Sequence, residues 1–322
     1  MSNKLVNDLN KLIKHPSSSG RIAKTKAVIP RAGSVASAKR PATGEAAPIE
    51  TTDSNPFILT ESLFYGNAGC IQLSIINGSI VDSRTESNHN STSVNGSEVS
   101  VYDGSIYFVV VDNDDYVICE NGVEVKRFAG LLVDHYVPGI VKTSNGYYVL
   151  VGSTNGGTTY LQKLSTGWVE TGTINLGAGL AESIATNDHY IVAVIQGTEF
   201  IATYIDINTE SIVGSVNFGN DDCQSVAGWG DKFVYLMRLT LPSRYEVRFY
   251  DRFRNMTQYI EFENNGYYGS SVALNDEYCL VLWDLGEFVV FKKGIDGFTE
   301  SETVSFFLSK YDANGICFNK QI

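Results

Sequence analysis

Beyond residue 56, apolar positions fall in short runs that end at turn-forming residues, and three stretches of this pattern are closely similar. They read "ESIATNDHYIVAVI" at 182–195, "QSVAGWGDKFVYLM" at 224–237 and "SSVALNDEYCLVLW" at 270–283. Each begins near a Ser-(Val/Ile)-Ala triplet, continues through a turn rich in Asn, Asp or Gly, and resumes with an aromatic residue and an apolar run. This pattern predicts two antiparallel strands joined by a tight turn.

The same unit recurs along most of the chain. The first residue after the turn is found at Tyr107, Tyr148, Tyr190, Phe233, Tyr278 and, less clearly, Cys317, at intervals of 41, 42, 43, 45 and 39 residues. A second series of turns runs out of phase with the first, from Asn77-Gly78 to Gly294–Gly297. With further hairpin turns between the two series, each period of roughly 43 residues has room for four strands, which is typical of a β-propeller blade.

The two ends of the repeat predict how the ring closes. The C-terminal stretch "SKYDANGICFNKQI" has turn and strand signals for two strands, and the region around 70–84 has signals for two more. Joining them in a shared blade closes the ring and removes exposed sheet edges. We therefore predict an all-β fold, a six-bladed β-propeller over residues 57–322. The small residues of the Ser-(Val/Ile)-Ala triplets are expected to let the innermost strands approach the axis.

The first 56 residues have a different pattern. Leu5, Val6, Leu9, Leu12 and Ile13 recur with helical spacing, which predicts an amphipathic helix over residues 1–15 that ends at His15-Pro16. Residues 16–56 contain no aromatic residue and most of the prolines, so we predict an extended arm. A helix this short is marginal alone, and its apolar face is expected to contact a partner, another copy, the chain's own body or a membrane surface.

Charge divides the chain in the same place. Residues 1–50 have a net charge of +6, whereas the remainder has −18, for a total of −12. We expect residues 1–56 to bind protein partners, and an acidic propeller is a poor surface for nucleic acid. The residues predicted to make these partner contacts are Leu5, Leu9, Leu12, Arg21, Lys24, Lys26, Arg31, Lys39 and Arg40.

Few residues suggest chemistry. The four histidines form no metal-binding motif, and no GxSxG or phosphate-binding loop is present, so we predict no catalytic residue, metal or cofactor. Asp221-Asp222 falls at a connection between blades, and Tyr267-Tyr268 is a candidate exposed aromatic pair; these four residues are the predicted ligand face, with a host glycan as candidate ligand. An enzyme would instead require carboxylates from different blades to converge at the mouth of the axis.

A short helix, the basic arm "GRIAKTKAVIPRAGSVASAKRPATGEAAP" at 20–48 and a propeller together resemble bacteriophage virion proteins of the tail, connector or fibre. The resemblance implies a non-enzymatic structural role in the virion, assembled in the host cytoplasm, with residues 1–56 bound to other virion proteins and several copies in a symmetric assembly. The alternatives are a carbohydrate- or receptor-binding propeller for host attachment, a polysaccharide-degrading propeller enzyme, and a cellular scaffold. No signal peptide is predicted, and no apolar run is long enough to span a membrane.

Overall fold

A computed structural model describes residues 56–62, 67–76, 79–90, 99–112, 114–129, 135–153, 155–239, 244–263, 269–283, 287–305 and 311–322. The predicted helix over residues 1–15, the predicted arm as far as residue 55, and the pair Tyr267-Tyr268 lie outside the described residues, and so do all nine predicted contact residues. The predictions made for them therefore remain predictions. Pro56, the last residue of the predicted arm, is the first residue of a strand.

The described residues form 24 β-strands. The first seven are β1 (Pro56–Ser62), β2 (Asn67–Ile76), β3 (Ser79–Asn90), β4 (Val99–Tyr102), β5 (Ser105–Asp112), β6 (Asp115–Glu120) and β7 (Val123–Phe128). The next eight are β8 (His135–Thr143), β9 (Gly146–Ser153), β10 (Thr158–Leu164), β11 (Glu170–Ala178), β12 (Leu180–Thr186), β13 (Tyr190–Gln196), β14 (Phe200–Asp206) and β15 (Ile212–Gly219). The last nine are β16 (Asp222–Trp229), β17 (Lys232–Leu239), β18 (Arg244–Asp251), β19 (Met256–Glu263), β20 (Gly269–Leu274), β21 (Tyr278–Trp283), β22 (Glu287–Gly294), β23 (Gly297–Ser305) and β24 (Tyr311–Lys320).

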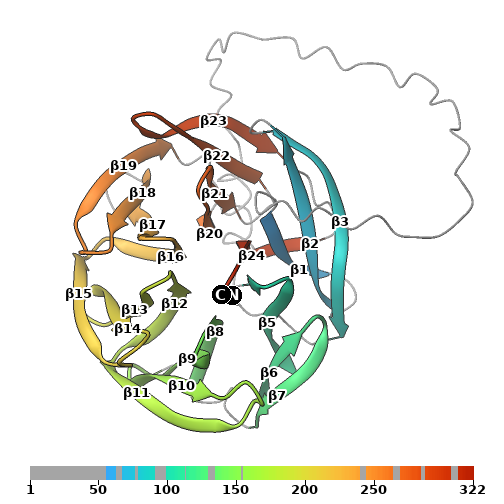
Figure 1. The fold of residues 1–322 in the computed structure, drawn as a ribbon, viewed down its shortest axis with the longest axis vertical. Helices are drawn as coiled ribbons and strands as arrows, with labels where there is room; N and C mark the ends of the chain where they lie inside the picture. The colour runs from blue at the N-terminus through green and yellow to red at the C-terminus, as the bar shows by residue number, and fades with distance from the viewer. Residues whose placement is uncertain are drawn as a thin grey trace, which may run out of the picture. The chain divides into compact units, whose positions relative to one another are not determined.

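These strands are arranged around an axis, with one strand of each group innermost and one outermost (Figure 1), and the fold is an all-β β-propeller. The prediction of six blades is wrong: hydrogen bonds join the described strands into five sheets, four of four strands and one of eight. The eight-stranded sheet has the order β3-β2-β1-β24-β4-β5-β6-β7, because β24 pairs in parallel with β4 through Asn319↔Val101 and Lys320↔Tyr102. A repeat period does not reveal whether neighbouring innermost strands form hydrogen bonds with each other.

The way the ends meet is also corrected. The C-terminal stretch supplies one strand, β24, which pairs antiparallel with β1, and the N-terminal side supplies three strands, β1 to β3. The sequence predicted two from each side because Asn314-Gly315 has the composition of a hairpin turn. In the structure the register passes from Leu59↔Gly315 to Thr60↔Ala313, so Asn314 is the extra residue of a β-bulge within one continuous strand.

The predicted tight turns are confirmed in the sheets from β4 to β23. The first strand of each group leads into the second through Asp103-Gly104 and the equivalent turns at 144–145, 187–189, 230–231 and 275–277. Asp103 and Gly104 both have positive φ, at 50° and 80°, as a two-residue hairpin of this hand requires. Because each group of strands alternates in direction, its first and third turns lie on one face of the ring, which we call the end face. The opposite face, where the innermost strands begin, is the start face.

The core lies between the sheets. The second strands are apolar almost throughout, and β5, β9, β13, β17 and β21 are buried along nearly their whole length. Free cysteines contribute to this interior: Cys119, Cys223 and Cys279 are buried and Cys317 is half-buried.

Serine side chains connect the innermost strands. Ser183 Oγ accepts a hydrogen bond from Val226 N at 2.9 Å, and Ser225 Oγ accepts one from Val272 N at 3.3 Å. Ser271 Oγ continues the series by accepting from Ile316 N of β24 at 3.2 Å. The serines of the Ser-(Val/Ile)-Ala triplets are thus acceptors that join each innermost strand to the next, which we call the serine ladder.

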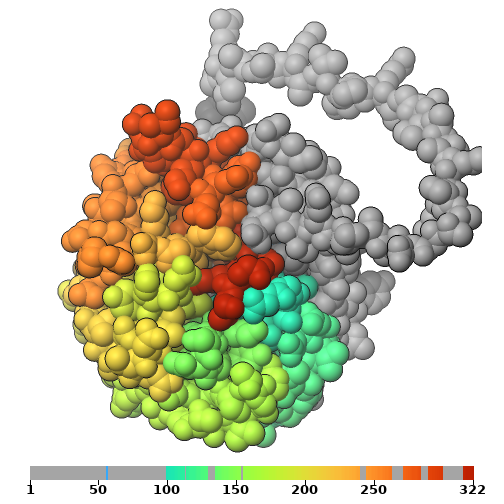
Figure 2. Space-filling view, in the orientation of Figure 1, coloured from blue at the N-terminus to red at the C-terminus, as the bar shows by residue number. Residues whose placement is uncertain are grey.

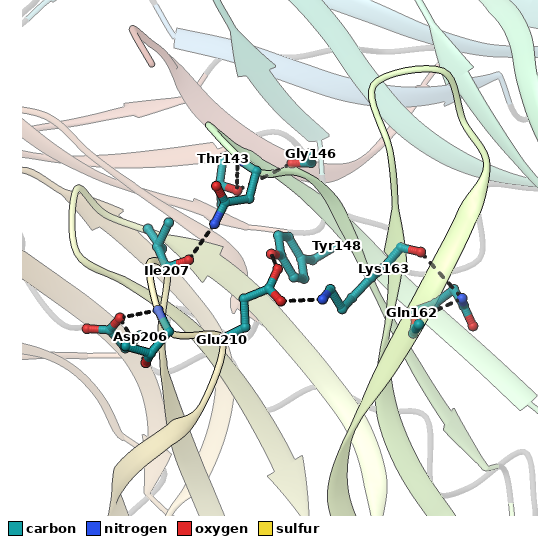
Figure 3. A network of polar contacts seen from close by, with 11 residues as sticks. Thr143, Gly146, Tyr148, Gln162, Lys163, Asp206, Ile207 and Glu210 are labelled. Carbon is teal, nitrogen blue, oxygen red and sulfur yellow. Dashed lines mark hydrogen bonds and ion pairs between the residues drawn. The ribbon is translucent and has the colours of Figure 1, made fainter.

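A polar network on the end face joins two sheets (Figure 3). Glu210, in the turn after β14, accepts a hydrogen bond of 2.5 Å from Tyr148 Oη of β9 and contacts Lys163 Nζ of β10. Nearby, Asn145 Nδ2 donates to the carbonyl of Ile207 at 2.7 Å. The hydrogen bond from Lys163, and then that from Tyr148, lowers the pKa of Glu210 below its ordinary value of 4.5. Glu210 is therefore ionised at neutral pH and links the sheet β8–β11 to the sheet β12–β15.

Candidate ligand-binding mouth of the ring

The axis itself has little free space. A cavity of about 60 Å³, room for about two water molecules, lies among β4, β12, β16, β20 and β24. Its wall consists mainly of small and aliphatic side chains, such as Ala185, Ala227 and Ala273. The axis has no room for a ligand larger than a few water molecules, so such a ligand can bind only at one of the two mouths of the ring.

On the start face, the innermost strands share a local irregularity. The pairing of β12 with β13 skips Glu182, the pairing of β16 with β17 skips Gln224, and that of β20 with β21 skips Ser270. Each skipped residue immediately precedes a serine of the serine ladder. A β-bulge redirects the side chain of its extra residue and is often found beside functional sites, so the bulges set apart one position on each of these three strands at the mouth.

Two carboxyl groups from different sheets interact at this mouth. Burial, and then the negative charge of Asp222, raise the pKa of Glu182 to about 7. Burial also raises the pKa of Asp222, while a hydrogen bond from Gln224 and the charge of Arg238 oppose that shift. Arg238 Nη1 lies 3.8 Å from Asp222 Oδ2. At neutral pH the Glu182 carboxyl group is therefore divided between its protonated and ionised forms.

A second set of charges lies beside the first. Arg248 of β18 donates from Nη2 to Asp221 Oδ2 at 2.7 Å and from Nε to Glu246 Oε2 at 2.6 Å. Glu246 is buried, with 7% of its surface exposed, and is compensated by this contact. Asp221 is thus held by Arg248, whereas Asp222 has the longer contact with Arg238 described above.

A groove lies on the same face, between the sheet β8–β11 and the sheet β12–β15. Its volume is about 670 Å³, and its walls come from the end of β11, the start of β12 and the turn between β13 and β14. Leu176, Leu180, Ile195 and Ile201 give it an apolar surface, with Thr198 and other polar residues at the turn. Leu180 lies two residues before Glu182 on β12, but Glu182 does not line the groove and interacts instead with Asp222 of the next sheet.

The structure brings together part of the predicted ligand face. Asp221 and Asp222 lie at the start of β16, as predicted, and Asp222 interacts with Glu182. Glu182 was missed because it reads as an ordinary polar residue before a core triplet. The sequence repeat does contain a signal for this position. A polar residue, at 182, 224 or 270, directly precedes each recurrent serine.

Chemically, the mouth contains hydrogen-bond donors and acceptors in close proximity. A half-protonated carboxyl group both donates and accepts, and the arginines only donate. Two carboxyl groups contributed by neighbouring sheets are also the arrangement that the enzymatic alternative predicts. Among the described residues, no group of three or more His, Cys, Asp or Glu side chains is placed to hold a metal ion, and no helix is long and apolar enough to cross a membrane.

Comparison with known proteins finds similarity in fold only. No protein-family model matches the chain, and no curated protein matches it. The Dos1 propeller matches 81% of this chain and 73% of its own at 8% identity and a TM-score of 0.49. The Cps50 (Swd1) β-propeller domain of Myceliophteria thermophila matches 77% of this chain and 86% of its own at 10% identity and a TM-score of 0.49. Hydrazine synthase of Kuenenia stuttgartiensis matches 79% of this chain and 80% of its own at 11% identity and a TM-score of 0.47. At such identities and scores these similarities contain no information about activity.

Proposed function

We propose that this chain is a non-enzymatic structural protein of a bacteriophage virion, in which the β-propeller is attached to the particle by residues 1–56. The observation that supports this proposal is the division of charge, +6 over residues 1–50 and −18 over the remainder. A basic segment of this composition gains binding energy by ordering along an acidic partner surface, while the acidic propeller stays outside as the exposed module. The proposal includes several copies in a symmetric assembly.

The strands that close the propeller all come from residues 56–322. Between residues 56 and 322 the described strands close on themselves, because β24 pairs with both β1 and β4. The propeller therefore has a closure that needs no strand from residues 1–55, and removing those residues is expected to leave it folded. Attachment is then a property of the N-terminal segment alone.

A comparison of two baits tests this proposal. Tagged full-length protein and a truncated form of residues 56–322 are incubated with lysate that contains the particle components, and bound proteins are identified by mass spectrometry. Recovery of head–tail or tail proteins by the full-length bait alone, with both baits equally stable in thermal unfolding, supports attachment through the N-terminal segment. Equal recovery of the same proteins by both baits contradicts it.

A second candidate function, carbohydrate or receptor binding for host attachment, is favoured by the mouth on the start face. Glu182, Asp222 and Arg238 present donors and acceptors there, as hydroxyl-rich ligands require, and the groove opens on the same face. Binding to a glycan array that is lost in Glu182→Gln and Arg238→Met, with Arg244→Met as an exposed control, supports this function. Release of reducing sugar that stops in Glu182→Gln assigns the mouth to an enzyme instead.

A further inference from the structure

A second cavity, on the end face, is separate from the mouth described above. Its volume is about 320 Å³, and its walls come from Lys142–Ser144, Thr186–Asp188, Ile207 and the C-terminal segment Lys320–Ile322. Figure 2 shows this face, with the C-terminal residues in red at the centre of the ring beside the segments near residues 100 and 145. The cavity thus lies beside the C-terminal residues, where four segments that are distant in the sequence meet.

Two lysines line this cavity. Lys320 is 8% exposed; its Nζ donates to the carbonyl of Thr186 at 3.1 Å and lies 3.4 Å from Asp188 Oδ1. Lys142 Nζ lies 3.1 Å from Asp103 Oδ2. An ammonium group has three N–H donors, so these contacts leave donors available on both lysines. Burial lowers the pKa of Lys320 to about 8, which leaves it mostly protonated at neutral pH.

A third residue of the wall, Asn187, has an amide donor that is not used. Asn187 is 2% exposed, and its Oδ1 accepts hydrogen bonds from the backbone N–H groups of His189 and Tyr190, both at 2.8 Å. These two donors fix which amide atom is the oxygen. Its Nδ2 is the only buried side-chain nitrogen or oxygen among the described residues without a hydrogen-bond partner. A buried donor without an acceptor is destabilising, because it loses its hydrogen bonds to water and gains none in return.

The equivalent turn in another sheet shows what the turn itself requires. Asn275, which is 5% exposed, accepts from the backbone N–H groups of Glu277 and Tyr278 at 2.8 and 2.6 Å, the same arrangement. In both turns the amide oxygen accepts the two backbone N–H groups, and an aspartate oxygen would accept them as well. The amide nitrogen at position 187 has no function in the turn, and its retention in a buried wall calls for an acceptor that the described residues do not provide.

We propose that this end-face cavity binds a small carboxylate-bearing molecule, whose oxygens accept hydrogen bonds from Asn187 Nδ2 and from the available donors of Lys142 and Lys320. The three groups are all donors, so the ligand must bring acceptors, and an ionised carboxylate is the acceptor that pairs best with ammonium groups. Asp188 contacts Lys320 and its side chain is 58% exposed, so water screens its repulsion of the ligand. A volume of about 320 Å³ equals roughly ten waters, enough for a di- or tricarboxylate of the size of citrate.

Calorimetric titration of the full-length protein with citrate tests this site. Citrate is expected to bind, and neutral erythritol is not. Asn187→Asp keeps the turn acceptor but removes the donor, and is expected to weaken citrate binding at least tenfold. The matched variant Asn275→Asp makes the same change in the equivalent turn and is expected to bind citrate as the wild type does.

Lys142→Met provides an independent variant if Asn187→Asp fails to fold, as judged by circular dichroism, and it too is expected to weaken binding at least tenfold. Absence of citrate binding to the wild-type protein overturns the proposal. So does binding that is unchanged in the folded variants at positions 187 and 142, or equally reduced in Asn275→Asp. None of these outcomes bears on the attachment function, which depends on residues 1–56.

Discussion

Replacing Ser183 with alanine tests whether the serine ladder holds the innermost strands together. Ser183 is fully buried, and its Oγ accepts the backbone N–H of Val226 in the next sheet at 2.9 Å. Alanine fits the same space but removes the acceptor, which leaves a buried N–H without this partner. The expected loss is about 1–3 kcal/mol of unfolding free energy, or a fall in Tm of roughly 3–10 °C for a domain of this size.

Thermal unfolding followed by circular dichroism measures this effect. Ser215→Ala, an exposed serine on the outer strand β15, is the matched control and is expected to change stability by less than about 0.5 kcal/mol. Ser225→Ala and Ser271→Ala remove longer contacts, of 3.3 and 3.2 Å, and are expected to cost less than Ser183→Ala. A Ser183→Ala protein as stable as Ser215→Ala would refute the assignment of the triplet serines to interstrand hydrogen bonds.

Three further predictions concern other parts of the propeller. Since folding raises the pKa of Glu182 from 4.5 to about 7, the stability of the wild type falls as pH rises through that window. In urea unfolding, Glu182→Gln should match the wild type at pH 4 and be more stable at pH 8 by on the order of 2 kcal/mol. A stability difference between variant and wild type that is the same at both pH values contradicts this. Folding lowers the pKa of Glu210, so its contribution to stability is present above its unfolded pKa and is lost as pH falls through the lower folded pKa. Glu210→Gln should therefore lower the unfolding free energy by about 1 kcal/mol at pH 7 and leave it unchanged at pH 2. A Cβ on Gly228 would lie 2.5 Å from the carbonyl oxygen of Thr186 in the neighbouring sheet, so Gly228→Ala should lower the unfolding free energy by about 1–3 kcal/mol. A Cβ on Gly167 would have its nearest neighbouring atom at 3.8 Å, so Gly167→Ala should unfold close to the wild-type temperature.

Much of the fold could be predicted from the sequence because a tight turn rich in Asn, Asp or Gly and the apolar run that follows it recur with one period. The strands from β4 to β23 and their tight turns follow from that repeat. The number of sheets could not be predicted, because the parallel pairing of Asn319 with Val101 and of Lys320 with Tyr102 depends on how two innermost strands meet in space. Likewise, Asn314-Gly315 has turn composition, but pairing with β1 makes it part of a bulge.

The candidate sites were less predictable. Asp221 and Asp222 were found because a pair of carboxylates at a strand connection is visible in sequence. Glu182 was not, because its raised pKa arises from burial and from Asp222 in another sheet, and neither is visible locally. The end-face cavity depends on Lys142, Asn187 and Lys320, which come from three different sheets and meet only when the ring closes.

The most direct test of the account is the incorporation of the protein into particles. Particles assembled with full-length protein or with residues 56–322 are purified on a density gradient, and the copies per particle are counted by quantitative mass spectrometry. Attachment through the N-terminal segment predicts a fixed number of full-length copies per particle and none of the truncated form, although the truncated propeller unfolds at the same temperature. Equal incorporation of both forms, or absence of the full-length protein from purified particles, would contradict it.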